Sequence, residues 1–168
     1  MTDSNALILE DNPFDQRILA TILRALGFSS VETEESTIQA FERVNQGNLS
    51  VVFADIVLPE GNGLEFLKLI RSSEHCRFPD VPVVIVSAHS ELKWVKRSIE
   101  YGADDFVVKP MSPEQIIRKV EPILRGDRPT FTRWKLQAKL GSKSQILKSG
   151  DELENPAEEA QEDILEVE

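Results

Sequence analysis

Five polar side chains lie at the ends of apolar runs, and together they could form a reactive site. The runs lie at residues 6–9, 51–54, 83–86 and 106–108. The side chains that follow them are Glu10 with Asp11, Asp55, Ser87 and Lys109. If the runs are neighbouring parallel strands, all five side chains meet at the edge where the strands end, and such sheets bind ligands at that edge.

Three carboxylates in one pocket predict a bound cation. Two carboxylates 5 Å apart repel each other by roughly 3 kcal/mol at an effective dielectric constant of 20. Lys109 offsets part of this repulsion, and a hard cation with oxygen ligands would offset the rest. Mg²⁺ suits a site that keeps several water ligands. Any one of these acids alone could simply cap the next segment, as Asp often does, but all of them at one edge favour a site.

The segments between the runs have the pattern of amphipathic helices. Their apolar stripes begin at Phe14, Ile38, Leu64, Leu92 and Ile116. Gly27, Gly47 and Gly102 end three of them, and Ser112-Pro113 is a typical helix start. A further run at residues 31–33 is short and flanked by acids, which indicates an edge strand.

This alternation predicts the fold class α/β. Five strands and five helices joined by short loops form a (βα)₅ unit, and right-handed crossovers favour a doubly wound, flavodoxin-like parallel sheet. The continuously apolar runs are typical of strands that are covered on both faces. Gly126-Asp127-Arg128-Pro129 indicates a boundary, so we expect one domain at residues 1–126 and an extension at residues 127–168 of this 168-residue chain.

The extension is first basic and then acidic. Residues 128–150 hold six basic residues and no acid, whereas residues 151–168 hold nine acids and no base. We expect residues 151–163 to be disordered. Because the net charge is −10 and the extension is short for a DNA-binding domain, we do not expect DNA binding.

The composition also bears on location. The sequence has no run of 18 apolar residues, so we expect no membrane span, and its N-terminus lacks the basic start of a secretory signal. The single Cys76 cannot form an internal disulfide. A cytoplasmic protein is the simplest interpretation.

Several motifs in order resemble the receiver domain of two-component response regulators, of the chemotaxis-regulator type. They are Ile8-Leu9-Glu10-Asp11-Asn12, Asp55-Ile56-Val57-Leu58-Pro59 with Gly63, Val86-Ser87-Ala88, and Tyr101-Gly102-Ala103-Asp104-Asp105-Phe106 through Lys109-Pro110. The resemblance covers about residues 4–125. It implies the sheet order 2-1-3-4-5 and a cis peptide bond between Lys109 and Pro110.

The resemblance also implies roles for the candidate site residues. Asp55 would accept a phosphoryl group from a phosphohistidine on a histidine kinase or a histidine phosphotransfer protein. Glu10, Asp11, Asp55 and the backbone carbonyl of Val57 would hold Mg²⁺. Lys109 and Ser87 would bind the phosphoryl group, and Ser87 and the aromatic Phe106 would switch conformation.

The resemblance further implies a protein that signals rather than an enzyme with a separate substrate. It would catalyse only its own phosphorylation and a slow dephosphorylation, because the apolar Val57 cannot orient a water molecule. His89 is most simply a solvated loop residue. The output would be a protein target, with a homodimer possible through the fourth helix, fifth strand and fifth helix. A phosphate sink, a relay intermediate and a module that works without phosphorylation remain alternatives.

Other functional classes fit the residues less well. A phosphatase with an aspartyl nucleophile typically needs an acid two residues later, where this chain has Val57. A flavodoxin-like cofactor binder needs a first loop that accepts phosphate, and Glu10 and Asp11 would repel it. Ser87 and His89 lie too close in sequence for a Ser-His-Asp triad.

Overall fold

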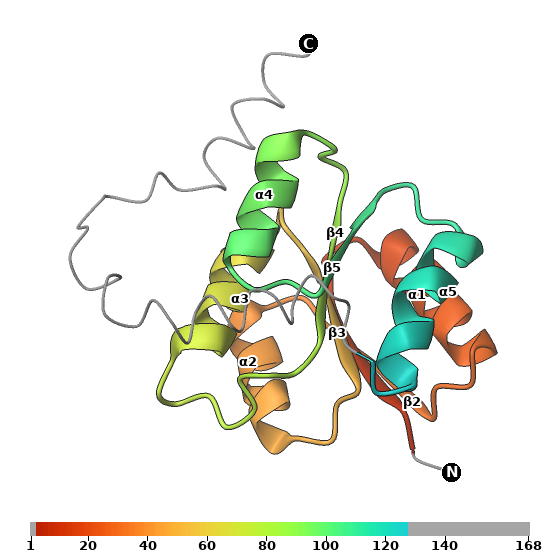
Figure 1. Ribbon diagram of the computed structural model, residues 1–168, viewed down its shortest axis with the longest axis horizontal. Coiled ribbons are helices and arrows are strands. Elements are labelled where there is room, and N and C mark those ends of the chain that lie inside the picture. Colours follow the sequence, from red (N-terminus) through yellow and green to blue (C-terminus); the bar gives the residue numbers. More distant parts are fainter. Residues whose placement is uncertain (1–2, 128–168) are drawn as a thin grey trace.

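Strands and helices alternate along residues 3–127, the part of the chain that this computed structural model describes (Figure 1). The strands are β1 (Asn5–Leu9), β2 (Ser30–Glu34), β3 (Val51–Asp55), β4 (Val83–Ser87) and β5 (Asp105–Val108). The helices are α1 (Pro13–Ala25), α2 (Thr37–Gln46), α3 (Gly63–Ser72), α4 (Leu92–Glu100) and α5 (Pro113–Leu124). The predicted extension at residues 127–168 lies outside the described residues from residue 128 onward.

All five strands form one parallel sheet in the order β2-β1-β3-β4-β5, which confirms the predicted order. The strand β2 lies at an edge, and its residues are at least partly exposed, as expected for an edge strand. The strands β1, β3 and β4 are buried along their whole length. The chain adds β2 on one side of β1 and then β3, β4 and β5 on the other side. The topological switch point of the sheet therefore lies between β1 and β3.

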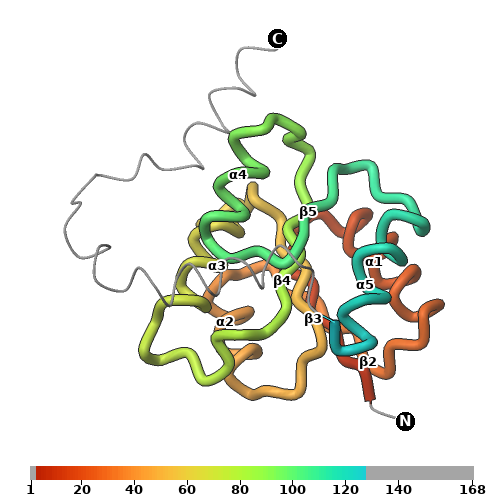
Figure 2. The backbone as a smooth tube through the Cα atoms, viewed as in Figure 1, coloured from red at the N-terminus to blue at the C-terminus, as the bar shows by residue number. Residues whose placement is uncertain are grey.

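Helices cover both faces of the sheet. The helices α1 and α5 lie together on one face, and α2, α3 and α4 cover the other (Figure 2). Successive strand residues alternate between the two cores, so Leu7 and Leu9 face the three-helix side whereas Ala6 and Ile8 face the two-helix side. This alternation follows from the period of two in an extended strand.

Side-chain caps begin four of the helices. Asn12, Ser36, Asn62 and Ser112 accept hydrogen bonds from backbone N–H groups in the first turns of α1, α2, α3 and α5. Ser112 and Gln115 form a capping box, which satisfies two donors reciprocally. Because each helix follows a parallel strand, the capped first turns lie at the carboxyl edge of the sheet.

Three apolar residues that open the predicted helical stripes do not pack in a core. Phe14, Ile38 and Leu92 are 66%, 71% and 64% exposed. Each lies in the first turn of its helix. Among residues 3–127, no helix has the length and apolar character needed to cross a lipid bilayer.

Candidate functional site

The carboxyl ends of four adjacent strands carry the predicted side chains. Asp55 and Ser87 are the last residues of β3 and β4, Glu10 follows β1, and Lys109 follows β5. In the strand register, Asp55 lies beside Val86 and Ser87 beside Val108. The sheet therefore brings these residues to one edge, as the order of the strands requires.

Glu10, Asp11 and Asp55 form a carboxylate cluster in which one oxygen of each lies within 4.8 Å of the others. Glu10 and Asp55 are buried, and Asp11 is partly exposed. Burial and the charge of Asp55 raise the pKa of Glu10 to about 7, against the lowering effect of Lys109 and the Asn12 N–H. Hard oxygen donors with this excess of negative charge fit a Mg²⁺ ion.

The ammonium group of Lys109 lies at the centre of the acids. Its Nζ donates hydrogen bonds to Glu10 Oε2 at 2.6 Å, Asp15 Oδ2 at 2.8 Å and Asp55 Oδ2 at 2.8 Å. Burial lowers the pKa of Lys109, but the hydrogen bonds to Asp15 and Asp55 outweigh it and raise the pKa above its ordinary value. Lys109 is therefore charged at neutral pH, and all three of its N–H groups are engaged.

The two carboxylate oxygens of Asp55 have different partners. Oδ1 accepts a hydrogen bond from the Val57 N–H at 3.2 Å, whereas Oδ2 faces Lys109. The loop after β3 then returns to the strand, because Val57 bridges to Asn62 and the Gly63 N–H donates to the Ile56 carbonyl. These contacts fix the orientation of the Asp55 carboxylate. The backbone carbonyl of Val57 as a metal ligand stays a prediction.

Ser87 is fully buried, and its Oγ accepts a hydrogen bond from the His89 N–H at 3.0 Å. The hydroxyl proton of Ser87 remains available for donation to another acceptor. The expectation for His89 was wrong. Its side chain is only 13% exposed, because the ring packs against Trp94 at 5.8 Å between centroids and its Nδ1 lies 3.7 Å from Glu91.

Phe106 lies in β5 beside Ile85 and is partly buried. It packs against the core beneath the three helices α2, α3 and α4. A hollow of about 400 Å³ between α4 and β5 borders it, with Val95, Ile99 and Val108 in its lining. The ring therefore has space beside it, and its role as a switch stays a prediction. The predicted cis peptide bond between Lys109 and Pro110 is confirmed.

Asp15 is a site residue that the sequence analysis missed. That analysis considered only the residues directly after the strands, whereas Asp15 lies in the first turn of α1. A signal was present, because the cap at Asn12-Pro13 places the first turn of the helix at the same edge as Glu10. An acid three residues after a helix cap that directly follows a site residue was therefore a candidate.

Comparisons with known proteins agree with this geometry. Residues 6–121 match the family model described as the response regulator receiver domain. The chain is 32% identical to the phosphate regulon transcriptional regulatory protein PhoB of Klebsiella pneumoniae over 123 residues, which cover 73% of this chain and 52% of PhoB. This chain therefore spans about half the length of the PhoB proteins that it matches.

Two further comparisons cover most of the other chain. The two-component response regulator ORR5 of Oryza sativa subsp. japonica is 32% identical over 122 residues, which cover 72% of this chain and 89% of ORR5. The receiver domain of the sensor histidine kinase PA1611 of Pseudomonas aeruginosa has a TM-score of 0.62 and 26% identity, with coverage of 71% and 97%. That crystal structure holds a magnesium ion in its active site cleft.

Proposed function

The chain belongs to the response regulator receiver domain family, and we propose that its Asp55 accepts a phosphoryl group from a phosphohistidine on a partner protein. The observation that carries this proposal is the position of Asp55 Oδ2. It lies 2.8 Å from the Lys109 ammonium, while the other carboxylate oxygen is held by a backbone N–H. Asp55 is therefore an oriented carboxylate beside a fixed positive charge.

The transfer exchanges one bond to phosphorus for another. Asp55 Oδ2 attacks the phosphorus atom, an O–P bond forms, and the P–N bond breaks with its electron pair left on the imidazole nitrogen of the donor. Because a carboxylate is a weak nucleophile, the rate depends on in-line positioning and on the neutralisation of the phosphoryl oxygens. The fixed orientation of Asp55 supports the first requirement.

Mg²⁺ would be held by Glu10, Asp11 and Asp55, together with the backbone carbonyl of Val57. When bound, the ion supplies positive charge opposite the phosphoryl oxygens. The carboxylate cluster and the raised pKa of Glu10 support this part of the proposal. Lys109 would donate an N–H to one phosphoryl oxygen, and the buried hydroxyl of Ser87 would donate to another.

The output would be a change in what the domain binds. Movement of Ser87 toward the phosphoryl group would couple to Phe106, which borders the hollow between α4 and β5. We place the interaction with a downstream protein target, or with a second copy of the chain, on the face of α4, β5 and α5. The phosphodonor would be a histidine kinase or a histidine phosphotransfer protein.

The chemistry proposed here is confined to the chain itself. Water slowly releases phosphate from Asp55 and restores the carboxylate, and no separate substrate is turned over. A cytoplasmic location is part of this proposal, because histidine kinases draw their phosphoryl groups from ATP, which is a cytoplasmic metabolite.

The test is phosphotransfer from a purified phosphorylated histidine phosphotransfer protein to the full chain. We expect the label to move to the wild-type chain with Mg²⁺ present, and to move neither to Asp55→Asn nor to wild type in EDTA. Lys119→Ala is a control for charge removal, because Lys119 pairs with Asp105 rather than with the acids at the site. Equal labelling of wild type and Asp55→Asn would overturn the proposal.

A further inference from the structure

Among residues 3–127, Asp15 is the one acid that contacts Lys109 without belonging to the carboxylate cluster. The ammonium group bonds to Glu10, Asp15 and Asp55, but only the first and last of these share the cluster of Glu10, Asp11 and Asp55. A lysine ammonium has three N–H donors. Each of them is therefore assigned to a carboxylate from a different segment of the chain.

The backbone of Asp15 is anchored at the start of α1. Asp15 lies in the first turn of the helix, where its own N–H and that of Phe14 donate to Asn12 Oδ1 at 3.4 and 2.9 Å. The positive end of the helix dipole stabilises an anion there. The side chain is 21% exposed, so water competes for it only in part. The carboxylate itself is held by the ion pair with Lys109.

We propose that Asp15 is a positioning residue that orients the ammonium group of Lys109 for the phosphoryl group. Asp15 and Glu10 engage two of the N–H groups, which directs the third at Asp55 Oδ2 and then at the phosphoryl oxygen that replaces it. A cation that binds Glu10 competes with Lys109 for that carboxylate. Asp15 lies outside the carboxylate cluster, so it can still accept a hydrogen bond from Lys109. This inference rests on the proposed function and names a residue that acts through Lys109.

The test measures binding of beryllium fluoride, a mimic of the phosphoryl group, to the full chain with Mg²⁺ by fluorine NMR. We expect Asp15→Ala to bind about tenfold more weakly than wild type, since a hydrogen bond to a charged group is lost. Asp15→Asn should recover part of the affinity, because its amide oxygen still accepts a hydrogen bond. The same order is expected for the rate of phosphorylation by phosphoramidate.

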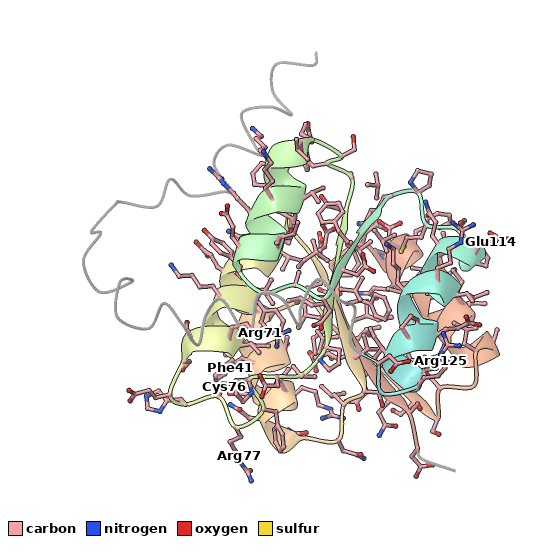
Figure 3. All side chains as sticks on the ribbon, in the orientation of Figure 1. Phe41, Arg71, Cys76, Arg77, Glu114 and Arg125 are labelled. Atoms are coloured by element: carbon pink, nitrogen blue, oxygen red, sulfur yellow. The ribbon has the colours of Figure 1, made fainter. Side chains whose placement is uncertain are left out.

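Two controls separate this role from a general effect on the helix. Exposed Glu114 also lies in the first turn of a helix, α5 (Figure 3), so Glu114→Ala should bind as wild type does. In a Lys109→Met background, Asp15→Ala should cause less than about a twofold further loss, because two residues that act as one unit are not additive.

Each of three results of the binding experiment would overturn the inference. They are unchanged binding in Asp15→Ala, the same tenfold loss in the Lys109→Met background, and an Asp15→Asn variant no better than Asp15→Ala. If thermal denaturation shows no unfolding transition for Asp15→Ala, the test rests on Asp15→Asn. This variant must then lose some affinity for beryllium fluoride, but less than Lys109→Met does. A wild-type chain that takes phosphate from phosphoramidate while Asp15→Ala does so equally well refutes only this inference. A wild-type chain that takes none refutes the proposed function as well.

Discussion

Gly63 lies directly against the backbone of Asp55. A Cβ atom built at position 63 would overlap with the Asp55 carbonyl oxygen, and the Gly63 N–H donates to the next carbonyl, that of Ile56. The first turn of α3 and the end of β3 can approach this closely only because residue 63 has no side chain. The position of the candidate acceptor is thus set in part by a residue eight positions later.

Gly63→Ala should therefore displace Asp55. We expect a loss of about 1–3 kcal/mol in the free energy of unfolding, as is usual when atoms are added to a packed site, and a phosphorylation rate that falls by more than the population of folded protein does. Urea titration and phosphoramidate labelling measure the two effects. Gly126→Ala is the matched control, because position 126 has a positive φ but no atom of residues 3–127 near the added Cβ. It should cost stability and leave labelling unchanged.

The stability of the protein should depend on pH because Glu10 is buried beside other carboxylates. In metal-free protein the pKa of Glu10 is raised to about 7 from its ordinary value of 4.5, so the folded state holds a proton that the unfolded state releases. This contribution to stability is full below pH 4.5 and is lost as the pH rises through 7. The difference between the two pKa values corresponds to a contribution of about 3 kcal/mol at most to the free energy of unfolding.

Urea titrations in EDTA at pH 5.5 and pH 7.5 measure this effect. We expect the wild type to lose stability at the higher pH relative to Glu10→Gln, which has no titrating group at position 10. Mg²⁺ should stabilise the wild type more at pH 7.5 than at pH 5.5, because it competes with the proton. The charged groups that face Glu10 are Asp11, Asp55 and Lys109. Parallel pH dependence in wild type and Glu10→Gln would refute this assignment.

Arg71 should be the most costly ion-pair residue to remove. Its guanidinium, at the end of α3 (Figure 3), donates to the carbonyls of Gly102, Pro79 and Val81 and to Asp104 Oδ2 at 2.9 Å. The Arg71 side chain is 8% exposed and that of Asp104 is fully buried. Arg71→Ala should therefore cost about 3–5 kcal/mol, since the buried Asp104 carboxylate loses the guanidinium that balances its charge.

The matched comparison for Arg71 is Arg43, which pairs with Glu32 at 2.7 Å at the edge of the sheet. Because Glu32 is 39% exposed, water can replace the arginine, and Arg43→Ala should cost about 1 kcal/mol or less. Urea denaturation measures the loss in the free energy of unfolding for both variants. A loss for Arg43→Ala as large as that for Arg71→Ala would show that burial does not control the contribution of these two ion pairs to stability.

Val57 should limit the loss of phosphate from Asp55. Its N–H holds Asp55 Oδ1 and its side chain packs against the core, so it offers no polar group to an attacking water. We expect Val57→Asn to release phosphate several-fold faster, because an amide can orient water. Val57→Leu should decay as slowly as wild type. The decay rates are measured as the loss of labelled phosphate from each variant. Equal rates for Val57→Asn and Val57→Leu would show that Val57 does not limit the release of phosphate.

The strands were predictable because their physical signal is local. Four residues from Val51 to Ala54 are continuously apolar, and all are buried as a central parallel strand requires. The residue directly after each run then lies at the sheet edge by geometry alone. This is why Glu10, Asp55, Ser87 and Lys109 can be grouped from the sequence alone, although their roles stay predictions.

The features that were missed depend on contacts between segments. Helical spacing predicted an apolar stripe that starts at Phe14, but this side chain is 66% exposed. His89 looked solvated in the sequence, but Trp94 on the next helix covers its ring. The helix cap indicated that Asp15 lies near the site, but its contact with Lys109 joins residues 94 positions apart in sequence, and no local pattern shows that pairing.

The identity of the phosphorylated residue tests the central claim most directly. Borohydride reduces an acyl phosphate to an alcohol, so a phosphorylated aspartate becomes homoserine, which peptide mass spectrometry locates. After treatment with phosphoramidate and Mg²⁺, we predict homoserine at position 55 and at no other acid, and none when Mg²⁺ is removed. Homoserine at Asp11 or Asp15 with an unmodified Asp55, or no reduction product from the folded wild type, would contradict the account.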